Sequence, residues 1–363
     1  MSEPRQSWVD IAKGIGITLV VYGHVVRGWF GREIPVDAPV HAVIDSVLYL
    51  FHMPLFFFLS GLFFVPSLRR HGGGGLMWGK AETILYPYVL WTIFQGSIQV
   101  ALSAFSLTNH PTSIHDILSL GWKPLDQFWF LYALFGIYLF AAVCGSIKER
   151  HTLWLLVLVG GLLFAAQSQL TEIPPVNYIS PYLIYFACGA ASPAFFARLG
   201  RRPWLEAGAA LLLAIMAHVI FHGYMGWRYD AVHFNHAGLF WYSLPVTWLS
   251  LLAVVCVSRL LSCWRLPWLV HLGTASMGIY LMHTLATAGL RVGMTKVLGL
   301  HGEALYIFVG TLGGLLFPLL ALWFLERRQF TWLFRMPAWM IRFFDPVIHM
   351  VTRCASRPDA QKQ

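Results

Sequence analysis

Residues 304–325 read ALYIFVGTLGGLLFPLLALWFL, a run that contains no charged side chain. As an α-helix this run is about 33 Å long, enough to cross the roughly 30 Å hydrocarbon core of a bilayer. The core of a soluble protein could not cover a helix that is apolar on every side, whereas lipid can. The run therefore predicts a membrane-spanning helix.

The composition extends this prediction to the whole chain. Of its 363 residues, 58% are hydrophobic and only 11% are charged, whereas soluble domains carry roughly 25% charged residues. The formal net charge of +9 lies in short loops and a tail, where positive charge orients membrane proteins and meets anionic headgroups. We therefore predict that membrane lipids, and not nucleic acid, are its charged partners.

Ten apolar runs are long enough to cross the membrane. They cover residues 7–29, 46–66, 78–106, 125–145, 152–168, 179–197, 204–222, 239–258, 267–290 and 303–325. The first run is read as a retained span and not as a cleaved signal, because Asp10 and Lys13 interrupt its start and no small-residue cleavage site follows. We predict an all-α, polytopic transmembrane bundle of about ten helices over residues 1–325, followed by a tail over 326–363.

The distribution of positive charge sets the orientation of these spans. Most of the 25 Lys and Arg residues fall in the tail or in loops on the side of the N-terminus, so both termini are predicted to be cytoplasmic. The tail mixes aromatic residues with spaced arginines from Thr331 to Arg353, and Pro337 and Pro346 interrupt it. This pattern is typical of short interfacial helices on the inner leaflet.

The first span carries three ionisable residues, Asp10, Lys13 and His24. Such groups are costly within a membrane and are functional candidates for that reason, although Asp10 and Lys13 could equally lie at the headgroup boundary. Lys13 and His24 are about three helical turns apart, which places them on nearly the same face, about 16 Å apart along the axis. Asp10 is about 21 Å from His24 along a continuous helix, too far to orient the imidazole directly.

Three histidines from distant parts of the chain share one depth. Counted from the outer ends of their spans, His24, His52 and His283 all lie about 7–11 Å below the outer surface. A single buried histidine is more often structural, but a common depth favours a shared site. The run Gly273–Gly278, which includes Ser276 and precedes Tyr280, indicates close helix contact near His283.

A histidine layer of this kind suits acyl transfer. An imidazole can take a proton from an alcohol as its hydroxyl attacks a thioester, or can itself carry the acyl group, and neither route needs a metal. Lys13, with Arg69 and Arg70 on the same cytoplasmic side, could neutralise a polyanionic donor. An elongated donor would then bridge the distance between Lys13 and His24.

The motifs resemble those of the acyltransferase-3 family, which are integral membrane O-acyltransferases. Asp10-x-x-Lys13-Gly14 followed by Gly23-His24 is similar to the opening motif of that family. Later stretches are similar to its further motifs, and the resemblance covers residues 7 to about 325. These stretches are Phe51–Phe57 with Ser60-Gly61, Phe128–Leu131, and Ser276 through Tyr280 to His283.

The resemblance implies transfer of an acyl group, usually acetyl from acetyl-CoA, to a hydroxyl of a carbohydrate or cell-surface glycoconjugate in a bacterial-type plasma (inner) membrane. By this analogy His24 is the catalytic residue, with no metal. Supporting roles would fall to Asp10, Lys13, His52, Ser276, Tyr280 and His283, and donor binding to Lys13, Arg69, Arg70 and Lys80. One departure concerns residues 80–88, where only Lys80 remains of the several basic residues that similar proteins carry.

Other interpretations remain open from the sequence. Buried His, Asp and Lys residues would also suit a transporter or flippase, and three histidines could bind one redox cofactor. The outer loops 107–124 and 223–238 are rich in residues that suit sugar stacking, although interfacial packing explains their aromatic residues equally well. These residues are His110, His115, Tyr224, Trp227, Arg228, Tyr229, Asp230, His233 and His236.

Overall fold

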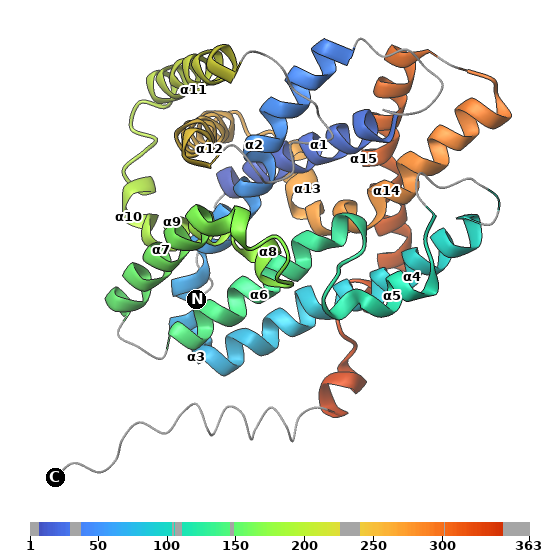
Figure 1. The fold of residues 1–363 in the computed structure, drawn as a ribbon, viewed down its shortest axis with the longest axis horizontal. Helices are drawn as coiled ribbons and strands as arrows, with labels where there is room; N and C mark the ends of the chain where they lie inside the picture. Colours follow the sequence, from blue (N-terminus) through green and yellow to red (C-terminus); the bar gives the residue numbers. More distant parts are fainter. Residues whose placement is uncertain are drawn as a thin grey trace. The chain divides into compact units, whose positions relative to one another are not determined.

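The computed structural model describes residues 7–29, 38–103, 105, 111–145, 149–225, 240–300 and 302–343. Within these ranges every regular element is a helix and no strand occurs (Figure 1). The prediction of an all-α fold is therefore confirmed.

In the described ranges, seven helical segments are long and apolar enough to cross a membrane, and each overlaps a predicted span, although the segment from Ile114 begins within the predicted outer loop 107–124. They are Ser7–Gly28, Val43–Leu62, Ile114–Cys144, His151–Gln169, Pro203–Tyr224, Tyr242–Ser262 and Glu303–Arg327. The chain is therefore a polytopic helical membrane protein, as its composition predicts.

The other three predicted spans are helical but interrupted. Residues 78–106 fall on the end of α3 (Phe64–Lys80), on a π-helical turn, η1 (Ala81–Leu85), and on α4 (Tyr86–Ser103). Residues 179–197 contain the short helices α9 (Leu183–Ala191) and α10 (Pro193–Phe196), and residues 267–290 divide into α13 (Pro267–Thr274) and α14 (Ser276–Val292). The total of ten crossings therefore stays a prediction.

The described helices belong to two compact units. The first comprises residues 1–59 and 192–324, and the second comprises residues 60–191 and 325–363. The first unit contains α1 (Ser7–Trp29), most of α2 (Ala38–Leu62), α10, α11 (Pro203–Met225), α12 (Phe240–Ser262), α13, α14 and nearly all of α15 (Glu303–Arg327). The second contains α3, η1, α4, α5 (Ile114–Leu118), α6 (Trp129–Cys144), α7 (Glu149–Ala166), α8 (Val176–Ile179) and α9.

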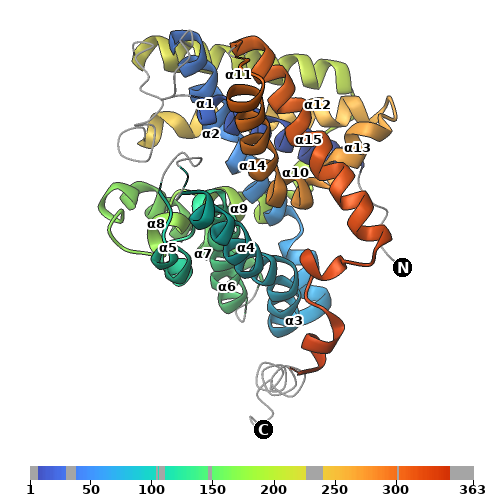
Figure 2. The same cartoon turned by 90° about the vertical axis from the view of Figure 1, so that its right-hand side faces the viewer.

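Helix α1 forms the core of the first unit, where it packs against α12, α13 and α14 (Figure 1 and Figure 2). Glycines permit the closest approach. A Cβ atom on Gly14 would lie 2.4 Å from the Leu269 carbonyl oxygen, and one on Gly273 would lie 1.7 Å from that of Asp10. Backbone contact between α1 and α13 therefore requires glycine at both positions, as expected where small residues bring membrane helices together.

The second unit is joined by similar close contacts. The Tyr138 hydroxyl donates a hydrogen bond to the Ser60 carbonyl (3.1 Å), and Gly61 faces the Phe186 backbone with no room for a Cβ atom. In α3 the chain turns at Gly72, whose φ of 66° lies in the left-handed region that suits glycine. This turn separates the two helical stretches of α3.

The first part of the tail also packs on the second unit. The Trp91 indole donates to the Leu333 carbonyl (2.8 Å), and Arg335 forms an ion pair with Glu82 (3.0 Å). The described tail contains a 3-10 turn, η6 (Thr331–Leu333), and a helical stretch over 338–343. The remainder of the predicted interfacial tail, from residue 344, lies outside the described residues.

Candidate active site

The structure brings two of the three predicted histidines into contact. His24 lies on α1 and His283 on α14, and their ring centroids are 4.9 Å apart with an interplanar angle of 65°. His24 keeps part of its surface exposed, whereas His283 is fully buried. The pair therefore combines one accessible imidazole with one that is enclosed by protein.

The orientation of His283 is set by its own helix. Its Nδ1 lies 2.8 Å from the Tyr280 carbonyl oxygen and 3.2 Å from that of Ile279. A carbonyl oxygen can only accept, so Nδ1 carries the hydrogen and Nε2 presents a lone pair. This buried Nε2 has no hydrogen-bond partner among the described residues, which leaves it available to a group beside His24.

His52 occupies a similar environment on α2. It is 2% exposed, and its Nδ1 lies 2.6 Å from the Leu48 carbonyl oxygen, which fixes the same tautomer as in His283. The Tyr49 ring packs against it edge to face, with centroids 4.5 Å apart. His52 also lies within electrostatic range of His24. All three predicted histidines thus belong to one region of the first unit.

An ion pair between a half-buried arginine and a buried carboxylate joins this region, and sequence reasoning missed it. Arg27, one turn after His24, donates two hydrogen bonds of 2.8 Å to the carboxylate of Asp45, which is 2% exposed. The Arg27 guanidinium carbon also lies 3.1 Å from the centroid of the Tyr49 ring, which in turn contacts His52. Asp45 and Arg27 therefore lock α1 to α2 beside the histidines.

Asp10 and Lys13 lie toward the other end of α1. The helix is continuous from Ser7 to Trp29, so the expected separations of about 21 Å and about 16 Å from His24 along the axis apply. Asp10 is 6% exposed and its backbone packs on Gly273. A direct Asp10–His24 pair is therefore excluded by geometry.

Ser276 and Tyr280 lie on the same helix as His283. Ser276 is the first residue of α14, directly after the break at Ala275. Tyr280 is buried, with its ring centroid 6.0 Å from that of His283, and its carbonyl accepts the Nδ1 hydrogen bond. Tyr280 is thus in contact with the site, and Ser276 lies two turns before His283.

The predicted donor-binding residues divide between the two units. Lys13 lies in the first unit, and Arg69, Arg70 and Lys80 lie in the second. Arg69 and Arg70 are exposed shortly before the turn at Gly72, whereas the Lys80 ammonium lies 4.2 Å from the centroid of the Tyr138 ring. Each unit thus carries basic side chains that were predicted to bind the donor.

The predicted acceptor loops are described only in part. His115 is exposed on α5, and Tyr224 at the end of α11 packs against Tyr242 at 5.7 Å between centroids. His110, Trp227, Arg228, Tyr229, Asp230, His233 and His236 lie outside the described residues. In the described part of the chain, no group of three or more His, Cys, Asp or Glu side chains is arranged to hold a metal ion.

Long apolar helices with imidazole side chains among them define a polytopic membrane protein that carries titratable groups inside its first unit. Residues 6–323 match the acyltransferase domain of the Acyl_transf_3 family. The chain therefore belongs to the acyltransferase-3 family and is a membrane acyltransferase, which confirms the prediction made from its motifs.

Two curated relatives carry the name nodulation protein NolL. The one from Mesorhizobium japonicum (strain LMG 29417 / CECT 9101 / MAFF 303099) is 24% identical over 291 residues, which cover 75% of this chain and 74% of the relative. The one from Sinorhizobium fredii (strain NBRC 101917 / NGR234) is 25% identical over 179 residues, which cover 49% of this chain and 47% of the relative. No solved structure matches the chain.

Proposed function

We propose that this acyltransferase moves an acetyl group from acetyl-CoA to a hydroxyl of a carbohydrate or cell-surface glycoconjugate, and that it works in a bacterial plasma membrane. His24 is the catalytic residue of this proposal. The observation that carries it is the contact between the partly exposed His24 ring and the buried His283 ring, whose Nε2 has no other partner among the described residues.

The proposed reaction begins with proton transfer. A ring nitrogen of His24 takes the proton of the acceptor hydroxyl as its oxygen attacks the thioester carbonyl. The carbon–sulfur bond then breaks, and the departing CoA thiolate receives the proton from His24. Alternatively, His24 first takes the acetyl group and passes it on to the hydroxyl. Both routes leave His24 unchanged at the end of the cycle.

His283 supports either route. Its unprotonated Nε2 can accept a hydrogen bond from an N–H group of His24, which stabilises the imidazolium formed when His24 takes a proton. The supporting role is similar to that of the third member of a catalytic triad, which holds the histidine in one tautomer. His52 and the Arg27–Asp45 pair hold the neighbouring part of α2 in place.

Lys13 provides positive charge for the phosphates of the donor at the predicted cytoplasmic end of α1. The distance of about 16 Å along the axis from Lys13 to His24 suits an elongated acyl-CoA whose thioester reaches into the bundle. Arg69, Arg70 and Lys80 remain donor contacts proposed from the sequence.

Labelled acetyl-CoA tests the proposal on the purified protein. The wild type should release or transfer labelled acetate, and His24→Ala should insert normally but lose about 10²-fold or more of the rate, the usual contribution of a general base. His71→Ala is the matched control, because the His71 ring is exposed and in the described part of the chain hydrogen-bonds the Ser67 carbonyl of its own helix. Mass analysis of surface polysaccharide made with each variant then identifies the acceptor.

Acetylation retained by His24→Ala would remove this residue from the mechanism. A wild type that neither binds nor hydrolyses acetyl-CoA would favour another acyl donor. Transport of a polar solute without any acyl transfer would point to the transporter interpretation.

A further inference from the structure

Helix α4 carries a row of polar side chains through a predicted membrane span. Thr92, Gln95, Gln99 and Ser103 follow at intervals of three and four residues, which places them on one face of the helix. Polar side chains are costly at this depth, so such a row indicates a structural or functional partner. Next to Thr92 in this row, the Gln95 amide exchanges two hydrogen bonds, of 2.9 and 3.3 Å, with the Gln127 amide.

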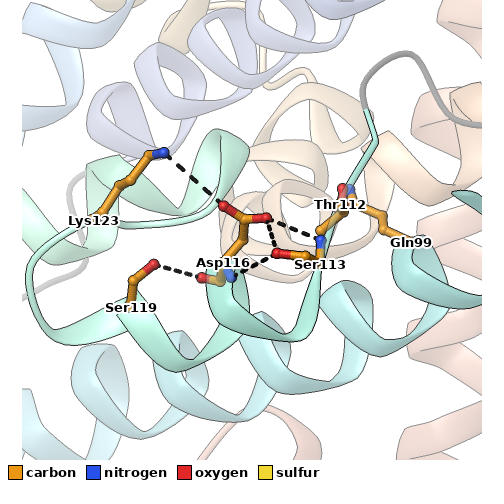
Figure 3. A network of polar contacts seen from close by, with 6 residues as sticks. All are labelled: Gln99, Thr112, Ser113, Asp116, Ser119 and Lys123. Atoms are coloured by element: carbon orange, nitrogen blue, oxygen red, sulfur yellow. Dashed lines mark hydrogen bonds and ion pairs between the residues drawn. The ribbon is translucent and has the colours of Figure 1, made fainter.

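The row opens at its other end into an exposed group. Gln99 donates a hydrogen bond of 2.6 Å to the exposed carboxylate of Asp126, and its amide oxygen accepts one of 3.3 Å from Thr112. Figure 3 shows Gln99 beside Thr112, with the Ser113–Asp116 helix cap next to them. On the predicted topology this end of α4 faces the outer side of the membrane.

Asp126 has a backbone conformation that few residues adopt. Its φ of 43° lies in the left-handed region, which is uncommon for any residue except glycine, although Asp and Asn tolerate it best. Such conformations are costly and are frequent at functional sites. The turn ends directly at η3 (Asp126–Phe128) and α6, and leaves the Asp126 side chain exposed.

Aromatic rings lie one helical turn further along the chain. The Trp129 ring, at the start of α6, packs on the Tyr182 ring with centroids 5.1 Å apart and planes tilted by 31°. Both rings are partly exposed. Trp129 follows Asp126 by three residues, where η3 passes into α6, so the aromatic pair lies about one turn from the Asp126 carboxylate.

One buried hydroxyl on the same row has unmet capacity for hydrogen bonding. Thr92 is fully buried, and its Oγ1 has no hydrogen-bond partner among the described residues. A purely structural clamp between α4 and α6 would be expected to satisfy this group. Thr92 is thus a member of the row whose hydroxyl the described packing does not use.

We propose that the Gln99–Asp126 patch, formed by Gln99, Thr112, Asp126 and Trp129, binds a sugar ring of the acceptor. A carboxylate and an amide can bond neighbouring sugar hydroxyls, and the indole face packs on the apolar C–H face of the ring. This inference rests on the proposed carbohydrate acceptor. It assigns recognition of the sugar to residues of the second unit.

Asp126→Asn tests the patch with little disturbance, because Asn also tolerates a positive φ. Acetyl transfer is measured with varied amounts of polysaccharide extracted from the host envelope. Loss of the charged acceptor should raise KM for this polysaccharide about tenfold or more, with a smaller change in kcat. Asp116→Asn is the matched control, because among the described residues the Asp116 carboxylate contacts Ser113 and Lys123 of its own loop (Figure 3), and its KM should stay at the wild-type value.

A binding measurement separates this inference from the proposed function. Saturation-transfer NMR with methyl glycosides of glucose, galactose, mannose and N-acetylglucosamine is recorded on His24→Ala protein, alone and combined with Asp126→Asn or Trp129→Ala. Signals from at least one glycoside should appear with His24→Ala and fall several-fold in both combinations. These glycoside signals and their loss are expected whether or not acetyl-CoA proves to be the donor.

Two results from the variants would overturn the inference. One is an unchanged KM in Asp126→Asn together with unchanged glycoside signals in Trp129→Ala. The other is an equal loss of thermal stability and of kcat in Asp126→Asn with no change in KM, which would make the patch a structural clamp. Absence of glycoside signals from the protein with an intact patch would equally contradict it.

Discussion

The imidazole rings of His24 and His283 meet edge to face, with centroids 4.9 Å apart, although they lie at opposite ends of the chain. The Tyr280 carbonyl accepts a hydrogen bond from Nδ1 of His283. The lone pair of Nε2 therefore points away from α14 and has no hydrogen-bond partner among the described residues. Among the described residues the rings of His24 and Tyr280 contact His283. In the proposed function, the Nε2 lone pair stabilises the proton that His24 takes up.

His283→Asn and His283→Gln distinguish the two ring nitrogens. Asn can place an amide N–H near the position of Nδ1 but has no atom at Nε2, whereas the Gln side chain reaches the Nε2 position with an acceptor oxygen. We expect kcat for acetyl transfer to fall about 10²-fold in His283→Asn but only about tenfold in His283→Gln. Equal losses in the two variants would show that Nε2 of His283 has no special role.

The Arg27–Asp45 pair predicts a large effect on stability. Arg27→Ala leaves the buried Asp45 carboxylate without its bidentate partner, which costs about 3 kcal/mol for pairs of this kind. We expect the apparent Tm of the protein in detergent to fall by about 5 °C. The loss should be smaller in the double variant Arg27→Ala/Asp45→Asn, because the amide needs no counter-ion.

A thermal shift in Arg27→Ala that the second substitution does not reduce would mean that the pair contributes through packing alone. Arg27→Lys provides a further control. It keeps the charge but not the two parallel hydrogen bonds, so an intermediate Tm is expected.

Simple helix geometry predicts the relation among the histidines. A rise of 1.5 Å per residue and the direction of each span give His24, His52 and His283 one depth, and the structure places His24 against His283 with His52 nearby. The same arithmetic keeps Asp10 away from His24, because α1 is continuous. Depth along a membrane span can thus be obtained from sequence when the direction of the chain is known.

The Arg27–Asp45 pair was missed because the ends of spans are poorly defined by hydropathy. The predicted second span begins at residue 46, directly after Asp45, whereas α2 begins at Ala38 and contains this residue. The available signal was an acid and a base near the outer ends of two consecutive antiparallel spans. Such residues favour an ion pair, because each would otherwise be buried alone.

The interruptions in three spans were missed for a different reason. Hydropathy reports whether side chains are apolar and says little about whether the backbone is continuous. The run 267–290 is uniformly apolar enough for one span, yet its helix breaks at Ala275, and η1 interrupts the run 78–106. Only backbone contacts, such as those of Gly273 with Asp10, determine where these helices stop.

Gly273→Ala should prevent α13 from approaching α1. The added Cβ atom would lie 1.7 Å from the Asp10 carbonyl oxygen, and backbone on both sides must shift to relieve the clash. We expect little monodisperse protein on size-exclusion chromatography, and a lower apparent Tm in what remains. Gly289→Ala on α14 is the matched control, because its Cβ atom meets nothing within 4 Å. Equal yields for the two variants would show that the helices can separate at no cost.

The contact between the tail and the second unit can be tested through the ion pair of Arg335 with Glu82. The Glu82 side chain is 9% exposed and that of Arg335 is 67% exposed, so water screens the pair in part and its contribution is about 1 kcal/mol. Arg335→Ala should lower the apparent Tm by a few degrees, and Glu82→Gln should restore most of it, because a neutral amide needs no counter-ion. The Arg342→Ala control removes an exposed arginine from the same tail and should have no effect.

In about 1 M salt the difference in Tm between the wild type and Arg335→Ala should shrink, since salt screens charges near the surface. A difference that persists unchanged would mean that the arginine stem, and not its charge, holds the tail in place.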